Sequence, residues 1–218
     1  MSPSAEGACG LRLQAVAGPS VLRDGPGPGE GIAGAAWSLR SLAGRIVEVS
    51  DSGAAPVLTA AAALVLEAQE GGELAAWIGL GDSVFFPPDL AGWGIDLEAL
   101  PVVRVPDLPA VCSAAEGLLR CGAFGLVVLD LKTQAGMRLA VQSRLAALAR
   151  RHRTTLLCLT RKKEGAPSLG PLVSLRGEGR ISKTAFGRFD WEIRITKDRQ
   201  GAPGWSHMET CRGTDGLC

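Results

Sequence analysis

The sequence predicts an α/β protein with a mostly parallel central sheet, flanking helices, and antiparallel strands at the C-terminal edge of the sheet. Two observations lead to this expectation. Between residues 45 and 160, short apolar runs alternate with longer amphipathic segments, which is the pattern of βαβ units. After residue 161 the apolar runs become shorter and glycines and charges separate them, which indicates antiparallel pairing.

Each element has its own local signal. Short apolar runs predict the parallel strands, at residues 45–50, 74–80, 102–105, 126–130 and 154–160. The amphipathic segments between them predict helices, at residues 57–69, 108–120 and 137–150. Gly71 and Gly122 follow two of these helices as C-terminal caps, and Pro87 suits the first turn of a further short helix. Three short antiparallel strands are expected at residues 172–176, 180–184 and 191–197.

Length and composition fit a single domain. The chain has 218 residues, of which 46% are hydrophobic, so it can bury a sizeable core. Residues 1–34 are rich in glycine, proline and serine and predict a flexible segment, residues 35–200 hold the core, and residues 201–218 predict a loose polar tail. No long apolar run lacks charges and the first ten residues show no signal pattern, so we expect a cytoplasmic protein that does not enter a membrane.

The loop that follows the first predicted strand stands where a nucleotide-binding P-loop would lie. That loop has the form G-x-x-x-x-G-K-[ST] and holds phosphates with backbone N–H groups and a lysine. Here Asp51 occupies the first glycine position, and Ser52 and Gly53 follow it in the loop. The second glycine, the lysine and the hydroxyl residue are replaced by Pro56, Val57 and Leu58.

Each replacement opposes phosphate binding. Asp51 repels an anion, and Pro56 removes a backbone donor. Val57 supplies no cation, and Leu58 cannot ligate Mg²⁺. The sequence therefore predicts no nucleotide cofactor, no bound metal and no catalytic activity.

Several segments resemble the ATP-binding core of the RecA recombinase family, in the same order along the chain. They are GRIVEV at residues 44–49, GIDLEAL at 94–100, AAEGLLRCGA at 114–123, LVVLD at 126–130 and WEIRITKDRQGAP at 191–203. The resemblance covers roughly residues 35–205 and implies that residues 35–200 form a degenerate RecA-like core. It also places Asp130 at the position of the Walker B carboxylate.

The departures from the family pattern concern its chemistry. The catalytic glutamate position after the second strand holds Gly81, with Asp82 beside it. The two segments that resemble DNA-binding loops are short, at residues 132–136 and 161–170. A small RecA-like protein without nucleotide chemistry is similar to the ImuA family of the bacterial translesion mutagenesis cassette.

The resemblance to ImuA implies a function and partners. It implies a non-catalytic accessory protein of the SOS response that serves in translesion synthesis. The implied partners are an ImuB-like inactive homologue of Y-family polymerases and an error-prone replicative-type polymerase, with RecA and single-stranded DNA as further candidates. The expected location is the cytoplasm, in association with the nucleoid.

Charge is unevenly distributed along a chain whose net charge is only +1. Lysine and arginine predominate in residues 150–200, while acidic residues predominate elsewhere. A basic face of this kind suits a nucleic acid or an acidic partner, but charged edge strands that resist aggregation give the same pattern. Six residues are candidates for DNA contact: Arg161, Lys162, Lys163, Arg176, Arg180 and Lys183.

Two other functions fit the same sequence. One is a regulator that binds RecA or a cell-division protein as an inhibitor. The other is an atypical RecA-family ATPase, in which Arg45 or Lys132 would replace the missing lysine.

The remaining reactive and aromatic residues give weaker signals. Six cysteines lack C-x-x-C spacing, which argues against a zinc site or a disulfide framework, and Cys121 and Cys158 are expected to be buried thiols. Trp191 is expected to pack in the core. Apolar residues of the helix expected at 137–150 fit either a core face or a partner-docking stripe: Met137, Leu139, Ala140, Leu145 and Leu148.

Overall fold

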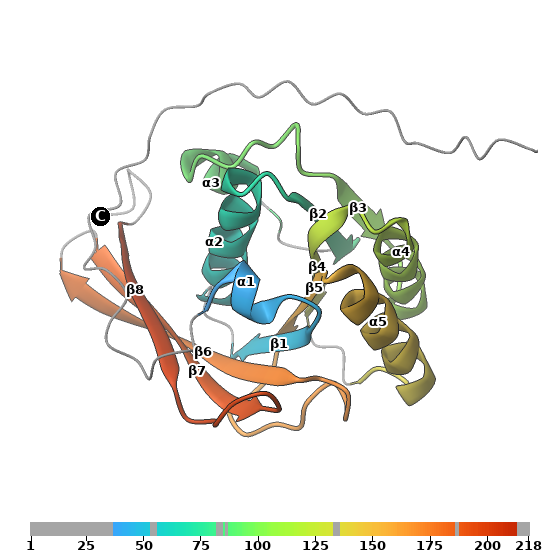
Figure 1. Ribbon diagram of the computed structural model, residues 1–218. Helices are drawn as coiled ribbons and strands as arrows, with labels where there is room; N and C mark the ends of the chain where they lie inside the picture. The colour runs from blue at the N-terminus through green and yellow to red at the C-terminus, as the bar shows by residue number, and fades with distance from the viewer. Residues whose placement is uncertain are drawn as a thin grey trace, which may run out of the picture.

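The computed structural model describes residues 37–52, 56–81, 85, 87–132, 136–185 and 188–212 (Figure 1). The strands are β1 Ile46–Asp51, β2 Leu74–Leu80, β3 Val102–Val105, β4 Phe124–Lys132, β5 Thr155–Arg161, β6 Leu175–Ala185, β7 Arg188–Asp198 and β8 Ser206–Arg212. The helices are α1 Leu39–Leu42, α2 Pro56–Glu70, α3 Pro87–Gly92, α4 Leu108–Cys121 and α5 Leu139–His152.

All eight strands belong to one sheet, in the order β3-β2-β4-β5-β1-β6-β7-β8. The neighbours from β3 to β6 pair in parallel, and β6–β7 and β7–β8 pair antiparallel. The prediction of an α/β fold with a mostly parallel sheet and antiparallel strands at its C-terminal edge is therefore confirmed.

The C-terminal half of the sheet differs from the sequence prediction in two ways. Two short strands were expected where the structure has one strand, β6, whose first residues also pair in parallel with β1. The expected loose tail is wrong for residues 206–212, which form β8 and pair with β7. Both differences arise because a long neighbouring strand supplies hydrogen-bond partners to segments of low apolar content.

Helices cover both faces of the sheet (Figure 1). Helix α2 packs on one face, where Val47 and Val49 of β1 point, and β6 and β7 also contact this helix. On the other face α4 and α5 pack over Ile46, Leu129 and their neighbours. Residues of β1 thus alternate between two apolar layers, as parallel strands with both faces covered do.

Local signals explain the helix ends. Asp107 caps the N-terminus of α4 by accepting a hydrogen bond from the backbone N–H of Ala110 at 2.8 Å. Gly122 follows α4 with a φ of 70°, a left-handed conformation that glycine adopts without strain. Helix α5 begins at Leu139, two residues later than predicted, and runs to His152.

A buried ion pair fixes the start of β1 against the end of β7. The Arg45 guanidinium donates to the Asp198 carboxylate and to both the hydroxyl and the carbonyl oxygen of Ser174. The side chains of Arg45 and Asp198 are 5% and 6% exposed. Burial alone would raise the pKa of Asp198, but hydrogen bonds from the Gln200 backbone and from Arg45 lower it below its usual value.

This lowered pKa predicts a loss of stability in acid. Because the folded-state pKa of Asp198 lies below its unfolded value of about 3.9, its stabilising effect is complete above that value and disappears as the pH falls through the folded pKa. The free energy of unfolding, measured in urea from neutral to strongly acidic pH, should fall less steeply in D198N than in the wild type.

The same variant should also be less stable at neutral pH, by about 3 kcal/mol, because Arg45 would keep a buried charge without its partner. Asp96 is exposed, so D96N serves as the matched control and should retain the wild-type pH dependence. A D198N curve that runs parallel to the wild-type curve would contradict the role given to this pair.

Candidate functional site

The carboxyl ends of β1, β5 and β4 meet at the edge of the sheet where open α/β proteins bind their ligands. Asp51 ends β1 and Asp130 lies near the end of β4, and both side chains are largely buried. Asp130 therefore lies in a strand, as the apolar run at residues 126–130 predicted. Gly53 and Asp82 lie outside the described residues, while Gly81 is an exposed turn residue after β2.

The P-loop positions at the start of α2 belong to the hydrophobic core. Val57 is 7% exposed and packs in the apolar cluster beneath α2, and Leu58 packs against the same cluster. Pro56 begins the helix, and Ser52 is exposed just before it. The two side chains that stand where a lysine and a hydroxyl would contact phosphate thus contact the core instead.

The buried carboxylate of Glu48 is the main polar feature of this region. Glu48 lies in the middle of β1 and its side chain is fully buried. Its Oε1 accepts hydrogen bonds from Lys162 Nζ at 2.7 Å and from the Thr160 hydroxyl at 3.2 Å. Its Oε2 accepts from the Ser168 hydroxyl and from the Leu169 backbone N–H, both at 2.8 Å. The carboxylate is fully hydrogen-bonded, as a buried charge must be.

The segment 162–170 after β5 folds over the carboxyl end of β1. Besides its contacts with Glu48, the Lys162 backbone N–H donates to the Asp51 carbonyl at 2.7 Å. The Gly165 N–H donates to the Glu178 carboxylate of β6 at 3.0 Å. A cavity of about 130 Å³ remains beside this segment, and three carboxylates line it together with two cations. That charge balance does not favour phosphate.

The structure separates the six cations that the sequence proposed for DNA contact. Arg161 and Lys163 are exposed. Lys162 is 9% exposed and bound to Glu48, and Arg176 is 7% exposed next to Glu178. Arg180 is exposed and paired with Glu164 at 2.6 Å. Lys183 lies in β6, and its side chain is outside the described structure.

The two cations considered as substitutes for the P-loop lysine have other environments. Arg45 precedes β1, at the opposite edge of the sheet from the P-loop position, and it binds Asp198. Lys132 ends β4 in a left-handed conformation with a φ of 51°. Arg45 cannot reach a phosphate at the carboxyl end of β1, because it lies at the other end of that strand.

Cysteine and tryptophan expectations are confirmed in part. Cys158 is fully buried in β5, and burial together with the nearby Glu48 charge raises the pKa of its thiol. Cys121 is exposed, so the prediction of its burial is wrong: it is the last residue of α4, beyond the apolar face. Trp191 is fully buried, as predicted, which removes it as a platform for stacking bases.

The apolar stripe expected on the helix at residues 137–150 divides between core and surface. Met137 and Leu145 are buried and Leu148 packs against the same cluster. Leu139 is 58% exposed and Ala140 is exposed. The core face of α5 thus explains most of the stripe.

Sequence reasoning missed the charged residues that organise this region: Glu48, Glu164, Glu178, Arg194 and Lys197. Glu48 carried a usable signal, because a single carboxylate inside an apolar strand must find a buried partner. In the described residues, no cluster of histidine, cysteine and carboxylate side chains suits a metal ion. No described helix is long and apolar enough to span a membrane.

Comparisons with known proteins give no family assignment. No protein-family model matches the chain, and a search of curated proteins finds no significant match.

The Glu48 contacts predict a large effect of a small substitution. Glu48→Gln keeps the shape of the side chain but leaves the buried Lys162 ammonium without its counter-charge, so we expect a loss of about 3–5 kcal/mol in the free energy of unfolding. Urea denaturation at neutral pH measures this loss.

The matched control is Glu164→Gln in the adjacent loop. Glu164 is 60% exposed, and its pairs with Arg180 and Arg194 should contribute less than about 1 kcal/mol. Adding Lys162→Met to Glu48→Gln should recover part of the lost stability, because the unpaired buried charge is removed. Equal effects of the two glutamine substitutions would disprove the anchoring role of Glu48.

Proposed function

We propose that this chain is a non-catalytic accessory protein with a RecA-like core, which acts in bacterial DNA-damage tolerance by binding partners. The order of its elements supports the proposal. A strand, a helix with the P-loop position at its start, a strand bearing Asp130 at its carboxyl end, and a final antiparallel pair follow one another as the resemblance implies. Residues 191–198 of the last RecA-like segment lie in β7.

The proposal that the protein is not a catalyst rests on the side chains at the carboxyl ends of the parallel strands. Val57 is buried in the core, and Lys162, a cation beside the end of β1, is already bound to Glu48. A phosphate group would meet the Asp51 carboxylate at the end of β1. Phosphoryl transfer depends on cations that neutralise developing charge, so this edge is poorly suited to it.

The partners proposed for the chain follow from the ImuA resemblance. They are an ImuB-like inactive polymerase homologue and an error-prone replicative-type polymerase, in the SOS-induced translesion synthesis that the family serves. Binding to RecA or to a cell-division protein as an inhibitor is the competing proposal, and the same experiment separates the two.

Only a few of the candidate cations whose side chains the structure describes could contact DNA. Arg161 at the end of β5 and Lys163 in the segment that follows are exposed, and Arg180 pairs with Glu164 of the same segment. Three cations of this kind would contribute a weak, salt-dependent contact with phosphates rather than sequence recognition.

Three experiments test the proposal, two on the purified chain and one by co-expression. Isothermal titration with ATP and Mg²⁺ should give no heat of binding, because Val57 and Leu58, at the lysine and hydroxyl positions, are apolar and pack with the core. Co-expression with the ImuB-like protein should yield a complex that survives size-exclusion chromatography. Fluorescence anisotropy with single-stranded DNA should show weak binding that R161E/K163E abolishes, while R120E, an exposed change on α4, has no effect.

The outcomes separate the alternatives. Micromolar binding of ATP would favour the atypical ATPase. Co-purification of RecA or of the division protein, with no retention of the ImuB-like protein, would favour the inhibitor and exclude the accessory role.

A further inference from the structure

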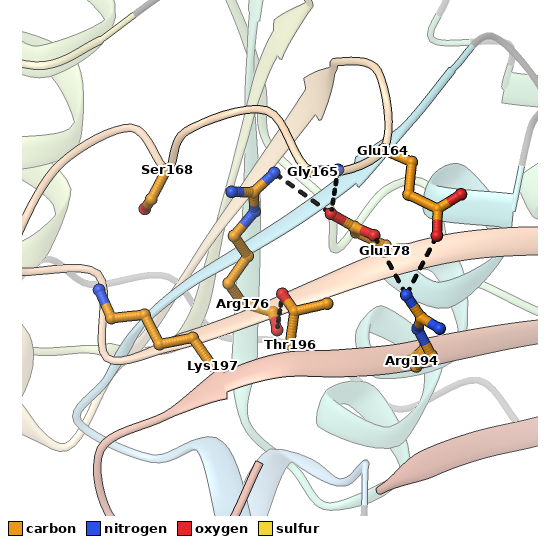
Figure 2. Close-up of a pocket in the computed structure, with 8 residues that line it drawn as sticks. All are labelled: Glu164, Gly165, Ser168, Arg176, Glu178, Arg194, Thr196 and Lys197. Carbon is orange, nitrogen blue, oxygen red and sulfur yellow. Dashed lines mark hydrogen bonds and ion pairs between the residues drawn. The ribbon is translucent and has the colours of Figure 1, made fainter. Parts of the chain in front are cut away.

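A second, larger cavity lies on the sheet face beyond α5, between the segment 162–170 and strands β6 and β7 (Figure 2). Its volume is about 420 Å³, which is within the range of small-molecule sites. Arg176 and Glu178 of β6 and Arg194 and Lys197 of β7 form its floor, and Glu164 and Ser168 contribute from the covering segment. Charged groups dominate this lining.

A row of charges crosses three neighbouring strands at this cavity. Glu48 of β1 is in register with Arg176 of β6, and Arg176 is in register with Lys197 of β7. The antiparallel register shifts after Arg176, so that Thr196 is an extra residue and both Thr196 and Lys197 line the cavity. The sheet thus places two cations directly opposite each other, an arrangement that is destabilising without a counter-charge.

Arg176 does not obtain full hydrogen bonding from the described part of the protein. Its residue is 7% exposed, and its Nε and Nη2 atoms are shielded from solvent and donate no hydrogen bond there. Glu178 Oε1 lies 3.5 Å from Nη2, beyond good hydrogen-bond distance, and the same oxygen accepts from the Gly165 N–H at 3.0 Å. Buried donors in folded proteins nearly always have a partner.

Lys197 is in a similar position. The residue is half-buried, and its side-chain ammonium makes no hydrogen bond or ion pair with the residues that the structure describes. Burial lowers the pKa of its ammonium, and the charges of Arg199 and Arg176 lower it further, against the opposing effect of Glu48. Glu48 itself is occupied by Lys162, Ser168 and Leu169.

The other charged residues of the cavity, one arginine and two glutamates, lie close to one another. Arg194 lies 3.1 Å from Glu164 and 3.9 Å from Glu178. With three cations and two carboxylates in its lining, the cavity carries one net positive charge. A single monovalent anion balances that charge, while the two glutamates repel an anion of higher charge or a long run of phosphates.

We propose that this cavity binds the carboxylate group of a small organic acid, held between Arg176 and Lys197. Arg176 and Lys197 lie opposite each other in the register of β6 and β7 and both line the cavity, so a carboxylate between them supplies the counter-charge that two neighbouring cations need. The Lys197 ammonium donates to the same group from the neighbouring strand. The rest of the acid occupies the remaining volume beside Thr196 and Ser168.

NMR of the full-length chain tests this proposal directly, because the Nε–H group of an arginine gives its own resonance. Sodium acetate, titrated at constant ionic strength against sodium chloride, should shift the Arg176 Nε–H resonance in a saturable manner. Lys197→Gln should weaken acetate binding about tenfold, as expected for one lost hydrogen bond to a charged group. Lys197 lacks ion pairs, so this variant should remain folded, which its amide spectrum verifies.

Lys163→Gln is the matched control, because Lys163 is an exposed lysine on the covering segment that does not line the cavity. It should bind acetate as the wild type does. A shift that chloride reproduces, or one that Lys197→Gln leaves unchanged, would overturn the site. Two further titrations, with inorganic phosphate and with a peptide that has a free C-terminal carboxylate, identify the class of ligand. If either one binds more tightly than acetate, the ligand is not a small organic acid.

Discussion

The buried ion pair between Glu48 and Lys162 is the constraint on which the arrangement of the candidate site depends. A carboxylate in the middle of a parallel strand cannot be hydrated, so it must be neutralised by groups that the fold brings to it. Here the end of β5 and the segment after it supply an ammonium, two hydroxyls and a backbone N–H. Satisfying one charge thereby fixes the path of residues 162–170 across the sheet.

That path determines what the two cavities can do. By crossing the end of β1 and bonding to Asp51, the segment leaves a small and acidic space at the carboxyl end of β1. By bonding to Glu178 through Gly165, it lies over the face of β6 and β7 and borders a larger space with one net positive charge. The path of residues 162–170 therefore shapes both the space at the end of β1 and the proposed carboxylate site.

Local signals sufficed for helices α2 to α5 and strands β1 to β5, because periodicity, caps and glycines are properties of neighbouring residues. Strand β8 and the continuity of β6 could not be obtained in this way, since their pairing partner β7 supplies the order. Local patterns also predicted that strands end near Asp51 and Asp130, and the structure has strands ending there. The burial of Lys162 and Arg176 could not be predicted from local patterns. Lys162 is buried against Glu48, which is 114 residues away in the sequence, and Arg176 is buried by the register of β6. Charge counted along the sequence could not distinguish a buried cation from an exposed one.

The central claim is that residues 162–170 are a fixed part of the sheet edge and leave no place for a nucleotide. Amide hydrogen exchange of Lys162 and Leu169 tests it most directly, since these N–H groups bond to Asp51 and Glu48. Both amides should exchange as slowly as those of β5, and at the same rate with or without Mg²⁺ and ATP. Rapid exchange at both positions, or protection that appears only when the nucleotide is added, would contradict the account.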